Sequence, residues 1–167
     1  MLGIARDSFS RPADTTQYAA NDLVANDVDA ADVAPMSFSV AKLGRGCGTV
    51  KRAILFTDNQ AVTAAIFNLH LFSREPDVNN GDNGAFSPLT AQYYLGAIPL
   101  DLSTGAAVSA TDKAKPGAPT AEINFDLTEI KATERRLWGL LATGTGGTYT
   151  PASGEVFEVT LEFEAVD

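Results

Sequence analysis

The sequence predicts an all-β protein, an antiparallel β-sandwich with a jelly-roll-like arrangement. Two observations lead to this prediction. Apolar residues recur mainly with a period of two, which is the period of a strand that buries one face. Clusters of Gly, Asn and Pro separate these alternating segments, as tight turns between short strands require. The chain has 167 residues, enough for one domain with a sizeable hydrophobic core.

The clearest alternation lies in residues 155–165. Large apolar side chains share one face of this segment: Phe157, Val159, Leu161 and Phe163. The other face carries acidic side chains: Glu158, Glu162 and Glu164. A helix would scatter both sets around its circumference, so we expect a half-buried strand.

Further strands are expected from similar patterns and from runs of β-branched and aromatic residues. They are residues 35–42, 49–57, 64–73, 93–100, 121–127 and 135–142. Turn signals lie between them, at residues 44–48, 79–84, 115–119 and 144–147. Only residues 128–135 favour a helical turn. Seven or eight short strands with this punctuation are typical of a sandwich.

The first 35 residues have a different composition, rich in Ala, Asp, Asn and Thr and poor in large apolar side chains. Such a segment buries too little surface to order independently. It is expected to be either an extended acidic N-terminal arm that orders against a partner, or an irregular edge of the domain. Residues 36–167 then form the β-sandwich domain.

The net charge of −9 is concentrated at the two ends of the chain. Residues 1–35 carry six Asp against Arg6 and Arg11, a sum of −4, and residues 155–167 carry −5. The remaining residues are neutral overall. Without a cluster of basic residues, neither nucleic acid nor an anionic membrane surface is an expected partner. The most apolar stretches, residues 61–67 and 137–142, are too short to span a bilayer, and no signal peptide is expected.

The residues that most often carry catalysis are scarce. His70 is the only histidine and lies among large apolar residues, so we expect a structural role. Cys47 is the only cysteine, so no intrachain disulfide is possible and a tetrahedral zinc site lacks its ligands. The glycines around Cys47 are followed by a β-rich run rather than a helix, which favours an inter-strand loop over a phosphate site. No catalytic, cofactor-binding or metal-binding residue is predicted, and no enzyme.

Three other features admit a functional alternative. Residues 77–82 resemble a calcium loop but lack its spacing, so a tight double turn is expected and a weak calcium site remains the alternative. Glu158, Glu162 and Glu164 are expected on a solvated face, with a basic partner or paired-carboxylate catalysis as alternatives. Strand aromatics are mostly core or cross-strand pairs, but exposed ones could stack on a sugar. The candidates for that role are Tyr93, Tyr94 and Trp138.

Three stretches carry a resemblance to a known family. They are residues 8–18 (SFSRPADTTQY) with 22–26, residues 81–86 (GDNGAF) with 94–96, and residues 149–155 (YTPASGE). In this order they resemble a family of small proteins encoded by tailed bacteriophages, often among the virion structural genes. The resemblance implies a virion component, a capsid decoration (cement) protein with a jelly-roll-like fold. The family offers no catalytic motif to transfer.

The expected function is therefore that of an accessory protein on a phage capsid, assembled in the host cytoplasm and bound to the major capsid protein. A homo-oligomer is expected, and the local threefold positions of capsids favour a trimer. Two alternatives remain open. One is a host-recognition or carbohydrate-binding module of a head fibre or tail, and the other is a neck or tail structural protein.

Overall fold

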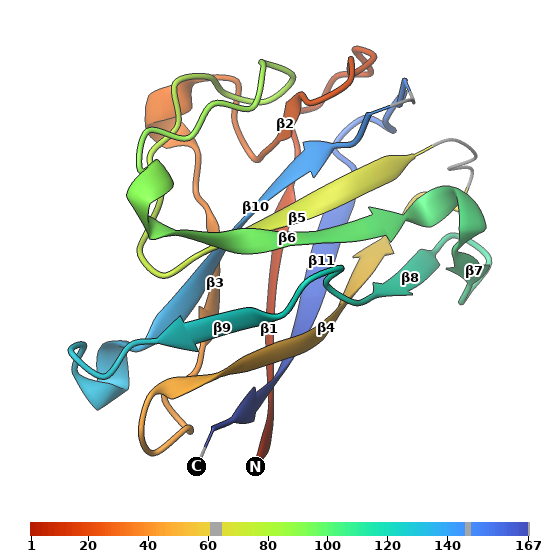
Figure 1. The fold of residues 1–167 in the computed structure, drawn as a ribbon. Helices are drawn as coiled ribbons and strands as arrows, with labels where there is room; N and C mark the ends of the chain where they lie inside the picture. Colours follow the sequence, from red (N-terminus) through yellow and green to blue (C-terminus); the bar gives the residue numbers. More distant parts are fainter. Residues whose placement is uncertain (61–64, 146–147, 167) are drawn as a thin grey trace.

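The computed structural model describes residues 1–60, 65–145 and 148–166. They form a β-sandwich of two antiparallel sheets (Figure 1), which confirms the predicted fold class. Residue 64 of one predicted strand and residues 146–147 of a predicted turn lie outside the described residues. The two chain ends lie next to each other at one end of the sandwich (Figure 1).

The first sheet has the strand order β1-β11-β4-β8-β7, and β9 pairs with the beginning of β4. Its strands are β1 (Leu2–Ser10), β4 (Cys47–Thr57), β7 (Ala106–Ala107), β8 (Lys113–Gly117), β9 (Ile123–Asp126) and β11 (Val156–Ala165). A bulge between Glu162 and Phe163 shifts the register of β11 against β4. This shift places Lys51 between the paired residues Val50 and Arg52.

The second sheet has the order β2-β10-β5-β6, and β3 pairs with the beginning of β10. Its strands are β2 (Leu23–Val24), β3 (Met36–Ser39), β5 (Ile66–Phe72), β6 (Tyr94–Asp101) and β10 (Arg136–Thr143). Four single-turn 3₁₀ segments lie in the connections: η1 (Ala30–Asp32), η2 (Ala91–Tyr93), η3 (Leu102–Thr104) and η4 (Ala132–Glu134). The last of them falls within the predicted helical turn.

The hydrophobic core lies between the two sheets and receives the inward face of each strand. In β11 the apolar face is buried as predicted, from Phe157 to Phe163. The chain crosses from one sheet to the other between β1 and β2, on both sides of β4, between β6 and β7, and on both sides of β10. This repeated crossing gives the sandwich its jelly-roll-like character.

The first 35 residues do not form the extended acidic arm, which is one of the two alternatives that their composition leaves open. Residues 2–10 are the edge strand β1, paired with β11 along its whole length, and Leu23–Val24 are β2, paired with β10. Tyr18 is buried and forms a bridge with Tyr149. The segment does need a surface to order against, as its composition indicates, but the same chain supplies that surface through β11.

The predicted turn at residues 115–119 is also wrong in its first half. Lys113–Gly117 form β8, and Pro116 lies opposite Ile54 of β4. A proline removes a ladder donor, so it is tolerated only where one side of a strand is open. β7 covers only Lys113 and Ala114, which leaves the other side of β8 open at Pro116.

Candidate functional site

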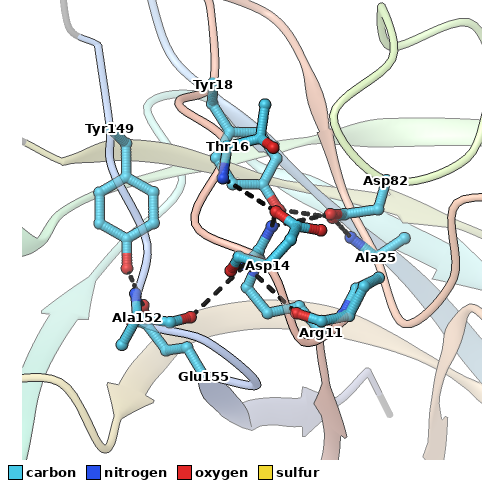
Figure 2. A network of polar contacts seen from close by, with 10 residues as sticks. Arg11, Asp14, Thr16, Tyr18, Ala25, Asp82, Tyr149, Ala152 and Glu155 are labelled. Carbon is cyan, nitrogen blue, oxygen red and sulfur yellow. Dashed lines mark hydrogen bonds and ion pairs between the residues drawn. The ribbon is translucent and has the colours of Figure 1, made fainter.

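A buried polar network ties the N-terminal segment to the sandwich (Figure 2). At its centre, the Arg11 guanidinium lies 2.9 Å from Oδ2 of Asp82, and both side chains are fully buried. Nε of Arg11 donates to the Tyr18 hydroxyl at 2.8 Å, and that hydroxyl donates to Oδ1 of Asp82 at 2.5 Å. The backbone N–H of Ala25 donates to the same Oδ1. Asp14 lies at the partly exposed side of the cluster and accepts from Arg11.

A second buried carboxylate adjoins the first network. Glu155, at the entrance to β11, accepts hydrogen bonds from the hydroxyls of Thr57 and Tyr149 and from the N–H of Ala152 at 2.9 Å. The rings of Tyr18 and Tyr149 stack with centroids 5.9 Å apart, which joins the two networks. Asp82 and Glu155 are both buried, and Figure 2 shows Asp82 beside Ala25 and Glu155 beside Ala152.

Burial and hydrogen bonding set the protonation of these groups. Burial raises the pKa of Asp82, opposed by the hydrogen bonds from Ala25, Tyr18 and Arg11. Burial also raises the pKa of both Tyr18 and Tyr149, so the phenols stay protonated and donate. Each oxygen of Asp82 and Glu155 accepts at least one hydrogen bond from the protein itself. We interpret the networks as the attachment of the N-terminal segment.

His70 lies in β5 on the outer face of its sheet, not inside the core. Its ring stacks on Phe86 with centroids 4.2 Å apart, and Nδ1 lies 3.2 Å from the Tyr94 hydroxyl. Burial lowers the pKa of His70 to about 4. The imidazole is therefore neutral at physiological pH and packs as an aromatic ring.

Cys47 begins β4, and its thiol lies 3.8 Å from the carbonyl oxygen of Val166. The loop at residues 77–82 directs the carboxylate of Asp82 inward to Arg11. Within the described part of the chain, no three His, Cys, Asp or Glu side chains are grouped so as to hold a metal ion. No helix among those residues is long and apolar enough to cross a membrane.

The glutamates of β11 lie on the outer face of the first sheet, and two of them form ion pairs with cations of the neighbouring strand β4. Arg52 donates two hydrogen bonds to Glu162, at 2.7 and 2.8 Å, and this lowers the pKa of Glu162. Lys51 lies 3.0 Å from Glu164 and lowers its pKa. Two of the three carboxylates are therefore already matched by cations of the same sheet, which weakens the reading of this face as a docking stripe for a basic partner.

The three aromatic candidates for sugar stacking lie near one another but differ in exposure. Tyr94 is 44% exposed, with its ring edge-on to Phe72. Tyr93 is half-buried, and the Arg74 guanidinium covers its ring at 5.0 Å. Trp138 is half-buried and packs against the small cluster around Phe72. Tyr93 and Trp138 border adjoining surface depressions that share Arg74.

An exposed apolar cluster lies at the end of the sandwich where the two termini meet. It consists of Met1, Leu2, Ile4 and Val166, which are 72%, 60%, 56% and 52% exposed. Leu2 and Ile4 lie two residues apart on the same face of β1, opposite Glu164 and Glu162. The carbonyl oxygen of Met1 accepts from Ala165 N–H, which brings the two chain ends together. Clustered exposed apolar side chains are typical of an interaction surface.

Beside this cluster, a groove opens between β1 of one sheet and β3 of the other. Its volume is about 470 Å³, and Ala5 and the ring of Phe163 are among its apolar lining. Three cations line it, Arg6, Lys42 and Arg136, against a single carboxylate, Asp7. We call these residues together the edge groove. In a chain of net charge −9, such a concentration of cations is distinctive.

Sequence reasoning missed the apolar end and the edge groove. Residues 2–10 do alternate, with Leu2, Ile4 and Arg6 on one face, but the apolar residues lie on the exposed face rather than the buried one. The cations of the groove come from residues 6, 42 and 136, so no local charge cluster is visible in the sequence. Tertiary structure alone brings them together.

No protein-family model and no curated protein matches the chain. Among solved structures, the chain is similar to one titled the native virion of Kashmir bee virus at neutral pH, with a TM-score of 0.34 and 12% identity. The match covers 98% of this chain and 72% of that one. These values are too low to assign the chain to that protein's family, so the proposals below rest on the chain's own residues and surface.

Proposed function

We propose that the protein is a virion structural protein of a tailed bacteriophage, a decoration (cement) protein on the capsid surface and not an enzyme. The exposed apolar end carries this proposal. Four large apolar side chains (Met1, Leu2, Ile4 and Val166) gather there, more than half of each exposed, at the free edge of a sheet. The resemblance of residues 8–18, 81–86 and 149–155 to the phage family supports the same function.

The apolar end attaches the protein to the major capsid protein, and the backbone ladder between β1 and β11 holds this end in place. Arg11 follows β1 directly, and its bond to Asp82 holds the strand against the body of the sandwich. Added interface across capsomer joints raises the barrier to rupture of the shell. A homotrimer at local threefold positions is the assembly that fits this role.

Counting copies on purified particles tests the function. A decoration protein is present at a level comparable to the major capsid protein, whereas a neck or tail protein is present at a small fraction of it. Quantitative protein staining measures this ratio. Leu2→Ser/Ile4→Ser should reduce attachment to capsids that lack the protein, whereas Val108→Ser, at a distant exposed apolar residue, should not.

A second candidate is a carbohydrate-binding module of a head fibre or tail, and the exposure of Tyr94 favours it. A module of this kind would lose glycan binding in Tyr94→Ala, whereas Tyr94→Phe would retain the stacking surface. Binding of the wild-type protein to a glycan array, lost in Tyr94→Ala, would favour this candidate over decoration.

A further inference from the structure

We propose that the edge groove binds an extended acidic segment of a partner protein, which adds as a strand to the free edge of β1. The inference rests on the proposed function, because it states the chemistry of the segment through which a capsid protein would be held.

The free edge of β1 offers backbone hydrogen-bonding groups. At one end Met1 accepts from Ala165, and at the other Arg11 N–H donates to Glu155, so odd-numbered residues direct their backbone groups to β11. Because these directions alternate along an antiparallel strand, the even-numbered residues direct theirs away from β11. The groups at Leu2, Ile4 and Arg6 therefore lie along the outer edge, where an added strand binds.

The second wall of the groove is β3, whose outer edge faces β1. The backbone N–H of Val40 donates to the carbonyl oxygen of Arg135, so the even-numbered residues of β3 direct their backbone groups to β10. The odd-numbered residues Ser37 and Ser39 therefore direct theirs outward. Asp7 joins the two edges at one point, since its carboxylate accepts from Ser37 N–H at 2.6 Å. Ser39 lies further along and lines the open part of the groove. A strand inserted into the groove therefore meets outward backbone hydrogen-bonding groups on both sides, from β1 and from β3.

The charge of the groove selects an acidic occupant. Within the described residues, Arg6 and Lys42 form no ion pair, and Arg136 donates only to the Ser37 hydroxyl, at 3.1 Å. The one carboxylate, Asp7, is engaged by backbone N–H groups of Ser37 and Ser8. Carboxylates of an entering segment would form ion pairs with Arg6, Lys42 and Arg136.

A peptide fits the groove better than a nucleic acid. A phosphate backbone pairs with the cations of the groove but has no peptide groups with which to continue the backbone ladder at the free edge of β1. A peptide strand, in contrast, uses the backbone edge as well as the charge. An alternating sequence places its carboxylates on one face and apolar side chains on the other, toward Ala5 and Phe163.

The experiment titrates the full chain into a fluorescein-labelled octapeptide of alternating Val and Glu and follows fluorescence anisotropy. We expect saturable binding that weakens as salt rises, and binding of the matching Val-Lys peptide that is weaker by about tenfold or more. Arg6→Gln and Arg136→Gln should each weaken binding about tenfold. Arg45→Gln removes an exposed cation outside the groove and should leave binding unchanged.

The backbone edge has its own test. Ile4→Pro removes an outward N–H without breaking a bond to β11, so it should weaken peptide binding while the unfolding midpoint stays near that of the wild type. If this variant is destabilised, a Val-Glu peptide N-methylated at alternate residues tests the same ladder on the wild-type protein. It should bind at least about tenfold more weakly than the unmodified peptide.

Three results overturn the proposal: equal binding of the Val-Lys peptide, unchanged binding by both Arg variants, or equally effective competition by oligothymidylate. Particle attachment of the same variants separates the site from the function. Peptide binding by a protein that does not attach to capsids would support the groove and reject decoration. If Arg6→Gln and Arg136→Gln lose peptide binding but still attach to capsids, the result would support decoration and reject the groove as the site of attachment.

Discussion

The buried pair of Arg11 and Asp82 should be the most sensitive polar contact in the protein. Among the described residues, Arg11 is the one side chain that donates to Oδ2 of Asp82, and Arg11→Met removes it, while Oδ1 keeps its donors Tyr18 and Ala25. A carboxylate oxygen is then buried without a partner. Removing one member of a buried ion pair costs about 3–5 kcal/mol in the free energy of unfolding. A domain of this size has about 5–15 kcal/mol in total, so the variant should fold but with a large loss.

Urea denaturation followed by the fluorescence of Trp138, the single tryptophan, measures this loss. A double-mutant cycle with Asp82→Leu isolates the interaction energy of the pair. Each single change leaves the other charge buried without its partner, whereas the double change removes both charges. We expect the double variant to be more stable than the sum of the single losses predicts, by about 1–3 kcal/mol. Lys131→Met is the control.

Lys131 pairs with Glu134 at 3.8 Å on the surface, with both side chains mostly exposed, so its removal should cost less than about 0.5 kcal/mol. Equal losses for Arg11→Met and Lys131→Met would refute the burial of the first pair. Strict additivity in the cycle would refute its coupling and, with it, our account of how the N-terminal segment is held.

Four other expectations follow from the same structure. Phe163→Ala should cost about 3–5 kcal/mol in the free energy of unfolding because it empties a core position. Glu162→Gln, on the solvent side of the same strand, should stay near wild type in the same denaturation assay, and equal losses would contradict the register of β11. Deleting residues 2–10 should abolish cooperative unfolding, because β11 loses nine paired residues, and a truncated chain that melts normally would contradict this. His70 has a pKa of about 4, below the unfolded value near 6.5, so between those pH values only the unfolded chain binds the proton. Stability should therefore fall by about 2 kcal/mol from pH 7.5 to pH 5, and His70→Gln should remove this dependence if the histidine is its source. Dialysis against a chelator should leave the melting temperature unchanged, and a loss restored by calcium would show a site in the loop at residues 77–82.

The strands that the sequence predicts correctly are those whose side chains report burial locally. Residues 155–165 alternate strictly, and the structure buries the apolar face of β11 between the sheets. Residues 49–57 and 135–142 have Val, Ile, Leu and Trp in runs that suit central strands, and they are β4 and β10. In each case the side chains themselves require a buried face, so a short window contains the information.

β1 and β8 escaped prediction because their side chains do not report the pairing. On the inner face of β1, the side of Gly3, Ala5 and Phe9, the residues are only half-buried. The strand is held by its backbone ladder to β11, some 150 residues away along the chain. β8 contains Pro116 and Gly117, which locally favour a turn, yet β4 imposes an extended conformation. Backbone hydrogen bonds carry no side-chain signature, so a sequence window cannot reveal them.

The sequence by itself determined the class of fold, the position of the central strands and the scarcity of catalytic residues, because composition and periodicity are local quantities. Only the tertiary structure decided that Arg11 and Asp82 form a buried pair, that Met1 and Val166 share an exposed apolar end, and that the edge groove collects its cations. Each of these contacts joins residues that lie far apart along the chain. Such contacts depend on how the strands are ordered in the two sheets, and that order is a property of the whole chain.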